Sequence, residues 1–135
     1  MAKAATLESA GVYEVIEAYR LPYYLAAATE ALLRVETFPH RRIWEPACGD
    51  GAISKVLEAA GYHVFSSDLH DRGYGTPNMD FVATVNINKF ACNIVTNPPF
   101  SLVLPFAQRA VDATAGTQRG KVALLLRLAC LEGQA

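Results

Sequence analysis

The sequence predicts an α/β fold, in which a parallel β-sheet carries helices on both of its faces. Short apolar runs alternate along the chain with stretches whose apolar residues recur at helical spacing, the pattern of repeated strand–helix units. Two of the predicted strands, 93–96 and 121–126, are almost continuously apolar, as expected where both faces of a parallel sheet are covered. A glycine-rich turn, 45–51, follows the first predicted strand. At 135 residues the chain has the length of one domain with a single core.

We expect residues 1–40 to form an N-terminal helical segment and residues 41–135 to form the core. The first helix is predicted over 7–20, where apolar residues recur loosely at helical spacing: Leu7, Val12, Ile16 and Tyr19. Leu21-Pro22 breaks this pattern, because proline removes a backbone donor and clashes with the preceding turn. A second helix follows, with four apolar residues on one side: Leu25, Ala28, Leu32 and Val35.

Five short strands are predicted in the core: 42–45, 63–68, 81–85, 93–96 and 121–126. Apolar residues at helical spacing predict a helix after the first strand: Ile53, Val56, Leu57 and Ala60, ended by Gly61. A second such stripe follows the fourth strand: Val103, Phe106, Ala107, Ala110 and Val111. The stretch 69–79 is rich in glycine and proline and is predicted to be a surface loop. Because the chain stops soon after the fifth strand, we expect an incomplete sheet whose exposed edge is covered by self-association or by a partner chain.

Composition narrows the classes of function. Hydrophobic residues make up 52% of the chain and charged residues 19%, which is typical of a globular protein. The net charge of −1 gives no overall electrostatic attraction for nucleic acid, so a polynucleotide must be bound through a local patch. The three cysteines are far apart and odd in number, which favours a reducing cytoplasm over a disulfide scaffold. Neither a secretory leader nor an apolar run of about 18 residues is found, so no membrane partner is expected.

The glycine-rich turn suits a nucleoside cofactor. Gly49 and Gly51 allow a tight turn from strand to helix and let a ligand approach backbone that no side chain shields. The spacing differs from the GxGxxG of NAD-binding proteins, and Glu45 stands in the strand just before the turn. A carboxylate there can meet a positively charged amino group, which a methionine moiety supplies. The alternative is a purely structural turn.

Two further acidic residues stand at positions where a nucleoside would be bound. Asp68 ends the second predicted strand, where a carboxylate can bind both hydroxyls of a ribose. Asp80 can accept a hydrogen bond from an adenine amino group while Phe81 flanks the ring. The alternatives are that Asp68 caps a loop and that Asp80 is a turn residue.

The tetrapeptide 97–100 follows the fourth predicted strand and suits a flat substrate that bears an amino group. Asn97 offers a side-chain carbonyl, while Pro98 and Pro99 stiffen the loop and leave their own carbonyls free to accept hydrogen bonds. Phe100 offers a face for stacking. A Pro-Pro pair after a strand is also compatible with an ordinary turn. Because ligands of such sheets bind at the carboxyl ends of the strands, the order of these motifs favours one shared site.

Four runs together resemble the motifs of S-adenosylmethionine-dependent DNA adenine-N6 methyltransferases, particularly those encoded by phages and prophages: 44–51, 67–68, 80–81 and 97–100. The resemblance covers roughly residues 28–133. It implies a Rossmann-like methyltransferase fold, here truncated after the fifth strand, with S-adenosylmethionine as cofactor and DNA as partner.

The resemblance also implies a role for each matching residue. Glu45, Gly49 and Gly51 would hold the methionine part of the cofactor, Asp68 the ribose, and Asp80 with Phe81 the adenine. The full implied cofactor-binding set is Glu45, Pro46, Ala47, Gly49, Gly51, Asp68, Leu69, Asp80 and Phe81. Asn97 and Pro98 would bind the target amino group, and Phe100 would stack on a flipped-out base. The implied catalytic set is Asn97, Pro98, Pro99 and Phe100, without a metal.

Two departures from the family leave alternatives open. Such enzymes usually carry a Thr-Pro-containing lid before the first helix, whereas this chain reads 24–29 as Tyr-Leu-Ala-Ala-Ala-Thr, and no segment resembles a target-recognition region. The substrate could instead be an RNA base or a protein glutamine amide, and a truncated, non-catalytic cofactor-binding domain is a further alternative.

Other polar residues carry less functional signal. The three histidines have no metal-ligand spacing, Arg41-Arg42 could meet phosphate but fits a solvated face better, and Cys48 fits a small buried thiol better than a nucleophile.

Overall fold

A four-stranded parallel sheet forms the centre of the computed structural model, which describes residues 3–7, 12–16, 24–84, 93–115 and 120–126. The strands are β3 (Arg42–Glu45), β4 (His63–Ser66), β5 (Asn93–Thr96) and β6 (Val122–Leu124). They lie in the order β4-β3-β5-β6, and each neighbouring pair is parallel. The predicted α/β fold with a parallel sheet is therefore confirmed, and it is consistent with a Rossmann-like arrangement.

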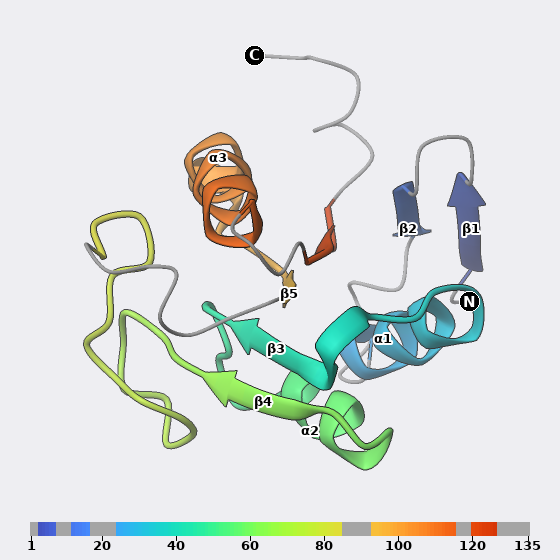
Figure 1. Cartoon of the computed structure of the whole chain (residues 1–135), viewed down its shortest axis with the longest axis horizontal. Helices are drawn as coiled ribbons and strands as arrows, with labels where there is room; N and C mark the ends of the chain where they lie inside the picture. The colour runs from blue at the N-terminus through green and yellow to red at the C-terminus, as the bar shows by residue number, and fades with distance from the viewer. Residues whose placement is uncertain (1–2, 8–11, 17–23, 85–92, 116–119, 127–135) are drawn as a thin grey trace.

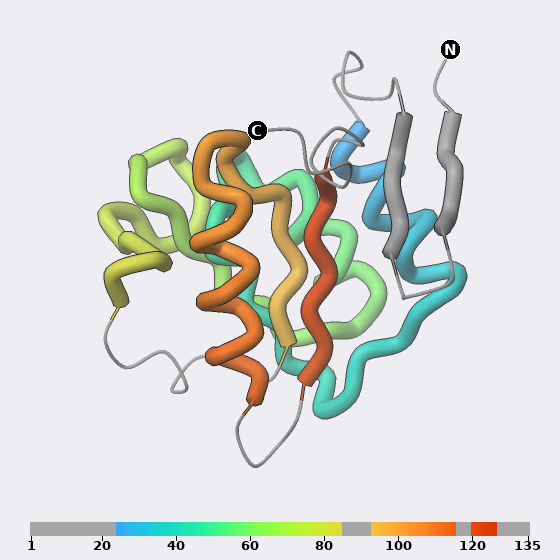
Figure 2. The backbone as a smooth tube through the Cα atoms, turned by 90° about the horizontal axis from the view of Figure 1, so that it is seen from above, coloured from blue at the N-terminus to red at the C-terminus, as the bar shows by residue number. Residues whose placement is uncertain are grey.

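Helices cover both faces of this sheet, as predicted. α1 (Tyr24–Val35) and α2 (Ala52–Ala59) lie on one face and α3 (Val103–Thr114) on the other (Figure 1). Figure 2 shows α3 lying along β5 and β6. Two short 3-10 turns, η3 (Pro39–Arg41) and η5 (Phe100–Leu102), precede β3 and α3.

Within the described residues the core consists of two apolar clusters, one on each face of the sheet. The cluster beneath α3 contains Trp44, Phe81, Ile94, Phe106, Ala110 and Ala113. The cluster beneath α1 and α2 contains Leu32, Phe38, Ile43, Ile53, Leu57 and Val95. Neighbours along a strand, such as Ile94 and Val95, belong to different clusters because successive side chains of a strand point to opposite faces. This double burial explains the near-continuous apolar runs of the sequence.

The end of α2 was predicted at Gly61 and is found there. Gly61 has φ +95°, its N–H donates to the carbonyl of Glu58, and the N–H of Tyr62 donates to the carbonyl of Leu57. These two bonds pair carbonyls that the helix end would leave unsatisfied. Arg41 completes the cap, because its guanidinium donates to the Gly61 carbonyl over 3.0 Å and lies over the Tyr62 ring. Arg41 therefore has a structural role here.

The predicted first helix is wrong where the structure describes it. Residues Lys3–Leu7 and Val12–Ile16 form the antiparallel strands β1 and β2. Four of the five residues of β2 are β-branched or aromatic, and such residues favour strands over helices, so the loose helical spacing was misleading. The remaining parts of that prediction, 8–11 and 17–20, lie outside the described residues.

The predicted third strand is also wrong over 81–84, where the chain forms a turn. Asp80 Oδ1 accepts hydrogen bonds from the backbone N–H groups of Val82 (3.1 Å) and Ala83 (3.3 Å). The aspartate thereby offers these N–H groups a local partner in place of a neighbouring strand. Val85, the last residue of the predicted strand, lies outside the described residues.

No helix in the described ranges has the length and apolar character that crossing a bilayer requires.

Candidate functional site

The carboxyl ends of β3 and β5 mark the point where a ligand is expected in this sheet. From β3 the chain goes outward to β4 on one side, and it later returns to place β5 on the other side of β3. Open α/β sheets bind ligands at such a change of direction, just outside the carboxyl ends of the strands. Glu45 ends β3 and Asn97 directly follows β5, so the structure brings these two predicted site residues to the same edge.

The glycine turn has one open and one closed position. Gly49 has φ +55° and Gly51 φ +91°, a backbone region that favours glycine. A Cβ atom at Gly49 would meet nothing within 4 Å, so the backbone there is open to a ligand. A Cβ atom at Gly51 would lie 2.8 Å from the ring of Tyr74, which belongs to the loop after β4. Gly51 is therefore needed for packing under Tyr74, and Gly49 is the position that a cofactor can approach.

Glu45 is buried, with 1% of its surface exposed, and it joins the ends of the two central strands. Its Oε1 accepts hydrogen bonds from the backbone N–H of Ala47, over 2.9 Å, and from the Thr96 hydroxyl at the end of β5. Burial raises the pKa of Glu45 to about 8, and the nearby Asp68 carboxylate acts in the same direction, although both hydrogen bonds oppose the shift. The carboxyl group is therefore largely protonated at neutral pH until a cation comes near it.

Asp68 fastens the glycine turn to the end of β4. One carboxylate oxygen accepts from the backbone N–H of Gly49, over 3.0 Å, and the other from the N–H of His70, over 2.9 Å. The loop-capping alternative is thus part of what Asp68 does, and its contact with a ribose stays a prediction. A carboxylate has about four acceptor positions, so these two bonds leave capacity for hydroxyl donors. The adjacent Leu69 is 48% exposed.

Asp80 and Phe81 occupy structural positions. Asp80 caps the turn over 81–84 described above, and Phe81 is only 2% exposed. The centroid of the Phe81 ring lies 5.0 Å from those of both Trp44 and Phe106, within the cluster beneath α3. A contact of these two residues with adenine stays a prediction. In the structure Asp80 caps a turn and Phe81 packs in the core.

The tetrapeptide 97–100 leads from the buried sheet to the surface. Pro98 is buried, Asn97 half-buried and Pro99 exposed, and Phe100 is 65% exposed. The carbonyl of Pro99 accepts a hydrogen bond from Leu102 over 2.9 Å, which starts η5. The Nδ2 group of Asn97 donates to the hydroxyl of Tyr24 over 3.2 Å.

Sequence reasoning missed Thr96, Tyr24 and Tyr74 as parts of this edge. A polar residue at the end of an apolar strand was the available signal for Thr96. Tyr24 begins α1 and lies 73 positions from Asn97 along the chain, so no spacing in a single sequence connects the two. The contact of Tyr74 with Gly51 likewise depends on the path of a loop.

Cys48 fits the interpretation of a buried thiol. It is 4% exposed, and burial raises its pKa to about 11, with the nearby carboxylates of Glu45 and Asp68 adding to the shift. A thiol of that pKa stays protonated and is a poor nucleophile at neutral pH. Among the residues that the structure describes, no three His, Cys, Asp or Glu side chains gather to hold a metal ion.

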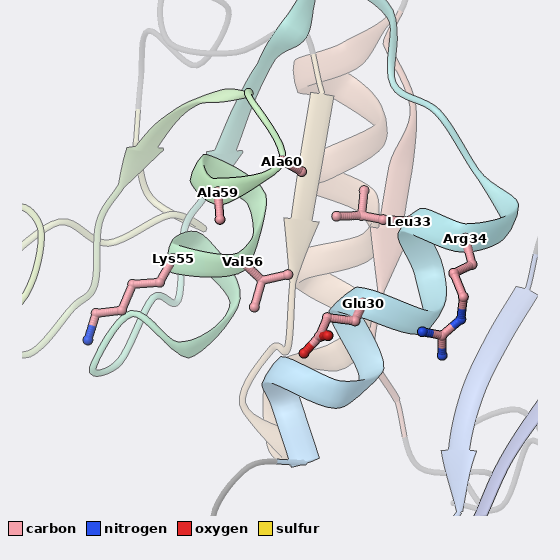
Figure 3. A pocket seen from close by; sticks show the side chains of 7 residues that line it. All are labelled: Glu30, Leu33, Arg34, Lys55, Val56, Ala59 and Ala60. Carbon is pink, nitrogen blue, oxygen red and sulfur yellow. The ribbon is translucent and has the colours of Figure 1, made fainter.

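A separate groove of about 560 Å³ lies between α1 and α2 (Figure 3). Leu33 and Val56 supply apolar lining, while Glu30, Arg34 and Lys55 supply charged groups. None of the predicted site residues lines this groove.

Neither the scan against known protein families nor the search among curated proteins finds a match to this chain.

Proposed function

We propose that this protein is an S-adenosylmethionine-dependent methyltransferase that acts on an exocyclic amino group, with adenine N6 in DNA as the favoured target. One observation carries the proposal: Glu45 and the tetrapeptide 97–100, here called the Asn97 loop, both lie at the carboxyl ends of the neighbouring strands β3 and β5. The resemblance of the sequence motifs to amino-methylating enzymes supplies the chemistry expected at that edge.

The residues at the glycine turn fit the cofactor. Open space above Gly49 admits a ligand to the backbone, and the buried Glu45 carboxyl group offers a counter-charge for an α-amino group. Asp68 has acceptor capacity left for ribose hydroxyls. When bound, S-adenosylmethionine supplies a methyl group on a positively charged sulfur for direct transfer to nitrogen.

The Asn97 loop would activate the acceptor. The amino nitrogen of adenine is a poor nucleophile, because its lone pair is delocalised into the ring. Hydrogen bonds from its two N–H groups to the Asn97 Oδ1 and to the Pro98 carbonyl would return electron density to nitrogen, and a preorganised polar group of this kind is worth about a hundredfold or more in rate. The exposed Phe100 would stack on the extruded base and offset part of the few kcal/mol that extrusion costs.

The test is transfer of a labelled methyl group. The protein is incubated with labelled cofactor and unmethylated DNA, and the DNA is digested to nucleosides. Label in N6-methyl-2′-deoxyadenosine is expected in the wild-type reaction, and no label is expected there with Asn97→Ala. Label in 5-methylcytosine would overturn the amino-group assignment. In parallel reactions with RNA or with protein in place of DNA, label in an RNA base or in a glutamine side chain, with none in DNA, would replace DNA as the substrate class.

Binding of the cofactor is measured separately by calorimetry. The pKa of Glu45 is about 8, and an α-ammonium group near it favours the charged form of the carboxyl group. Binding at pH 7 is therefore expected to release up to one proton from Glu45. This release makes the measured heat depend on the ionisation enthalpy of the buffer. Binding without transfer to any substrate would identify a non-catalytic cofactor-binding domain. No heat at millimolar cofactor, with the protein folded, would overturn the proposal.

A further inference from the structure

We propose that Tyr24 is a positioning residue that holds the side-chain amide of Asn97 so that its oxygen, and not its nitrogen, meets the methyl acceptor. This inference rests on the proposed function, because it assigns to Tyr24 the selection of a hydrogen-donating substrate. The observation behind it is the 3.2 Å hydrogen bond from Asn97 Nδ2 to the Tyr24 hydroxyl.

The hydrogen bond matters because the two ends of an amide differ chemically. Nδ2 carries two donors and Oδ1 accepts, so an amide turned by half a rotation would present donors to the N–H groups of a substrate amine. Two sets of donors repel each other. The Tyr24 hydroxyl can donate as well as accept, and in this structure it accepts from Nδ2, which leaves Oδ1 to accept from the amine. The hydrogen bond to Nδ2 polarises the amide in the direction that makes Oδ1 more negative.

Tyr24 begins a helix that is anchored to the core by its later residues. Tyr24 is half-buried at the first residue of the helix, and within the next three turns Ala28, Thr29 and Leu32 are buried. The Thr29 hydroxyl bonds back to the carbonyl of Leu25, and Leu32 belongs to the cluster shared with α2. Through Tyr24 this helix contacts a loop from another part of the chain.

This arrangement gives α1 a part in the site. In the family that the sequence resembles, a Thr-Pro-containing segment precedes the first helix, whereas here residues 24–29 form the first half of α1. The structure connects that segment to the Asn97 loop through the tyrosine hydroxyl.

The test compares Tyr24→Phe with a matched control, Tyr62→Phe. Both variants lose one hydroxyl and one hydrogen bond of 3.2 Å. Tyr62 directly precedes β4, at the amino edge of the sheet, and its hydroxyl accepts from the backbone N–H of Phe38. Tyr24→Phe is expected to lower kcat about fivefold to tenfold, the worth of one hydrogen bond, with the cofactor Kd unchanged. Tyr62→Phe should leave kcat unchanged. Equal kcat values for wild type and Tyr24→Phe would overturn the inference.

Asn97→Asp separates amide orientation from simple packing. Both carboxylate oxygens accept hydrogen bonds, so no orientation has to be held, and adding Tyr24→Phe to Asn97→Asp is expected to change kcat less than twofold. The same fivefold to tenfold loss in both backgrounds would show that Tyr24 acts without selecting the amide end, and the inference would fail.

A measurement without turnover keeps the two proposals distinguishable. In ¹⁵N-labelled protein the side-chain NH₂ signals of Asn97, assigned by their loss in Asn97→Ala, are expected to shift in Tyr24→Phe and to stay in place in Tyr62→Phe. Binding of a single-stranded oligonucleotide with one adenine should exceed binding of the same strand with hypoxanthine, and Tyr24→Phe should reduce this preference. If the wild type transfers no methyl group, the proposed function fails, and these two readouts alone decide whether Tyr24 orients Asn97: unchanged signals and an unchanged preference would overturn it.

Discussion

The two asparagines at the ends of β5 contrast a structural role of this side chain with the catalytic role that we propose for it. Asn93 begins the strand and is fully buried, and every polar atom of its amide is bonded. Its Nδ2 donates to the carbonyls of Pro39 (2.6 Å) and Arg42 (2.7 Å), and its Oδ1 accepts from the N–H of Lys121 (2.9 Å). It thereby joins the starts of β3, β5 and β6 at the amino edge of the sheet.

Asn97, just past the other end of the same strand, is half-buried and joined through Nδ2 to Tyr24. A side chain whose donors and acceptor are all paired within the protein has nothing left for a ligand, whereas one held by its donor end has an acceptor available. The comparison shows that Asn93 ties the amino edge of the sheet together, and it fits our proposal that the carboxyl edge carries the chemistry. Substitutions at the two edges test this division between a structural and a functional edge.

Replacing Asn97 by alanine separates the two edges most strongly. Asn97→Ala should lower kcat about a hundredfold or more, about 3 kcal/mol, because one of the two acceptors for the amino group is lost. The free energy of unfolding should change by less than about 1 kcal/mol, since only one partly exposed hydrogen bond is removed. Methyl transfer and urea denaturation measure the two quantities. A variant that is unstable but fully active when folded would contradict the division.

Replacing Asn93 by alanine should give the reverse result. Asn93→Ala removes a fully buried amide and leaves two carbonyls and one N–H, all in part-buried hydrogen bonds, without their partner, which should cost about 2–3 kcal/mol of unfolding free energy. For a chain of this size that lowers Tm by about 6–12 °C. The cofactor Kd of the folded variant should be unchanged. If Asn93→Ala kept normal stability but lost methyl transfer, the amino edge would have a functional role, and the division would be wrong.

The sequence correctly predicted those elements whose apolar residues recur with a clear period, and it located the motifs between them. The stripes of α2 and α3, the apolar strands β5 and β6 and the cap of α2 at Gly61 are confirmed, except that Ala60 of the α2 stripe lies just past the helix and is exposed. Within the α3 stripe Val111 is an exception, because it is 57% exposed. Elements with a mixed pattern were predicted wrongly: the β-branched residues of β2 were assigned to a helix, and a local cap by Asp80 replaced the strand expected after it.

The site could be predicted only in part, because its roles depend on long-range contacts. The sequence placed Asn97 at a strand end followed by two prolines, and the structure puts it at the predicted edge. It contained no signal that Asn93, four positions earlier, would bond to residues as distant as Pro39 and Lys121. Nor did it separate the open Gly49 from the packed Gly51, since only the path of the loop around Tyr74 distinguishes them.

A dependence of stability on pH should arise at the carboxyl edge. The pKa of Glu45 is raised from 4.5 to about 8 by burial, so the folded protein binds one more proton than the unfolded chain between these values. The stabilisation by the protonated carboxyl is fully present below pH 4.5 and is lost as pH rises through about 8, by about 2 kcal/mol or more. Urea denaturation at several pH values measures it.

Glu45→Gln is the matched control for this pH dependence, because glutamine keeps the acceptor for Ala47 and Thr96 and cannot titrate. It should flatten the dependence between pH 5 and 8, whereas Asn93→Ala should shift the whole curve downward and leave its slope unchanged. An unaltered slope in Glu45→Gln would show that another group titrates at this edge.

The smallest effect is expected at Asp68, where structure and binding overlap. Asp68→Asn replaces one of two carboxylate acceptors by a donor that faces the N–H of Gly49 or His70, which should cost about 1–2 kcal/mol of unfolding free energy. Asp71→Asn is the control: Asp71 also accepts a backbone N–H two residues ahead, that of Gly73, but it is exposed, and its replacement should cost under about 0.5 kcal/mol. If Asp68 also binds a ribose, Asp68→Asn should weaken cofactor binding about tenfold in calorimetry while Asp71→Asn leaves it unchanged. Lower stability with unaltered cofactor affinity would make Asp68 a loop cap alone, and the part of the carboxyl edge that binds ligand would then be confined to Glu45, the glycine turn and the Asn97 loop.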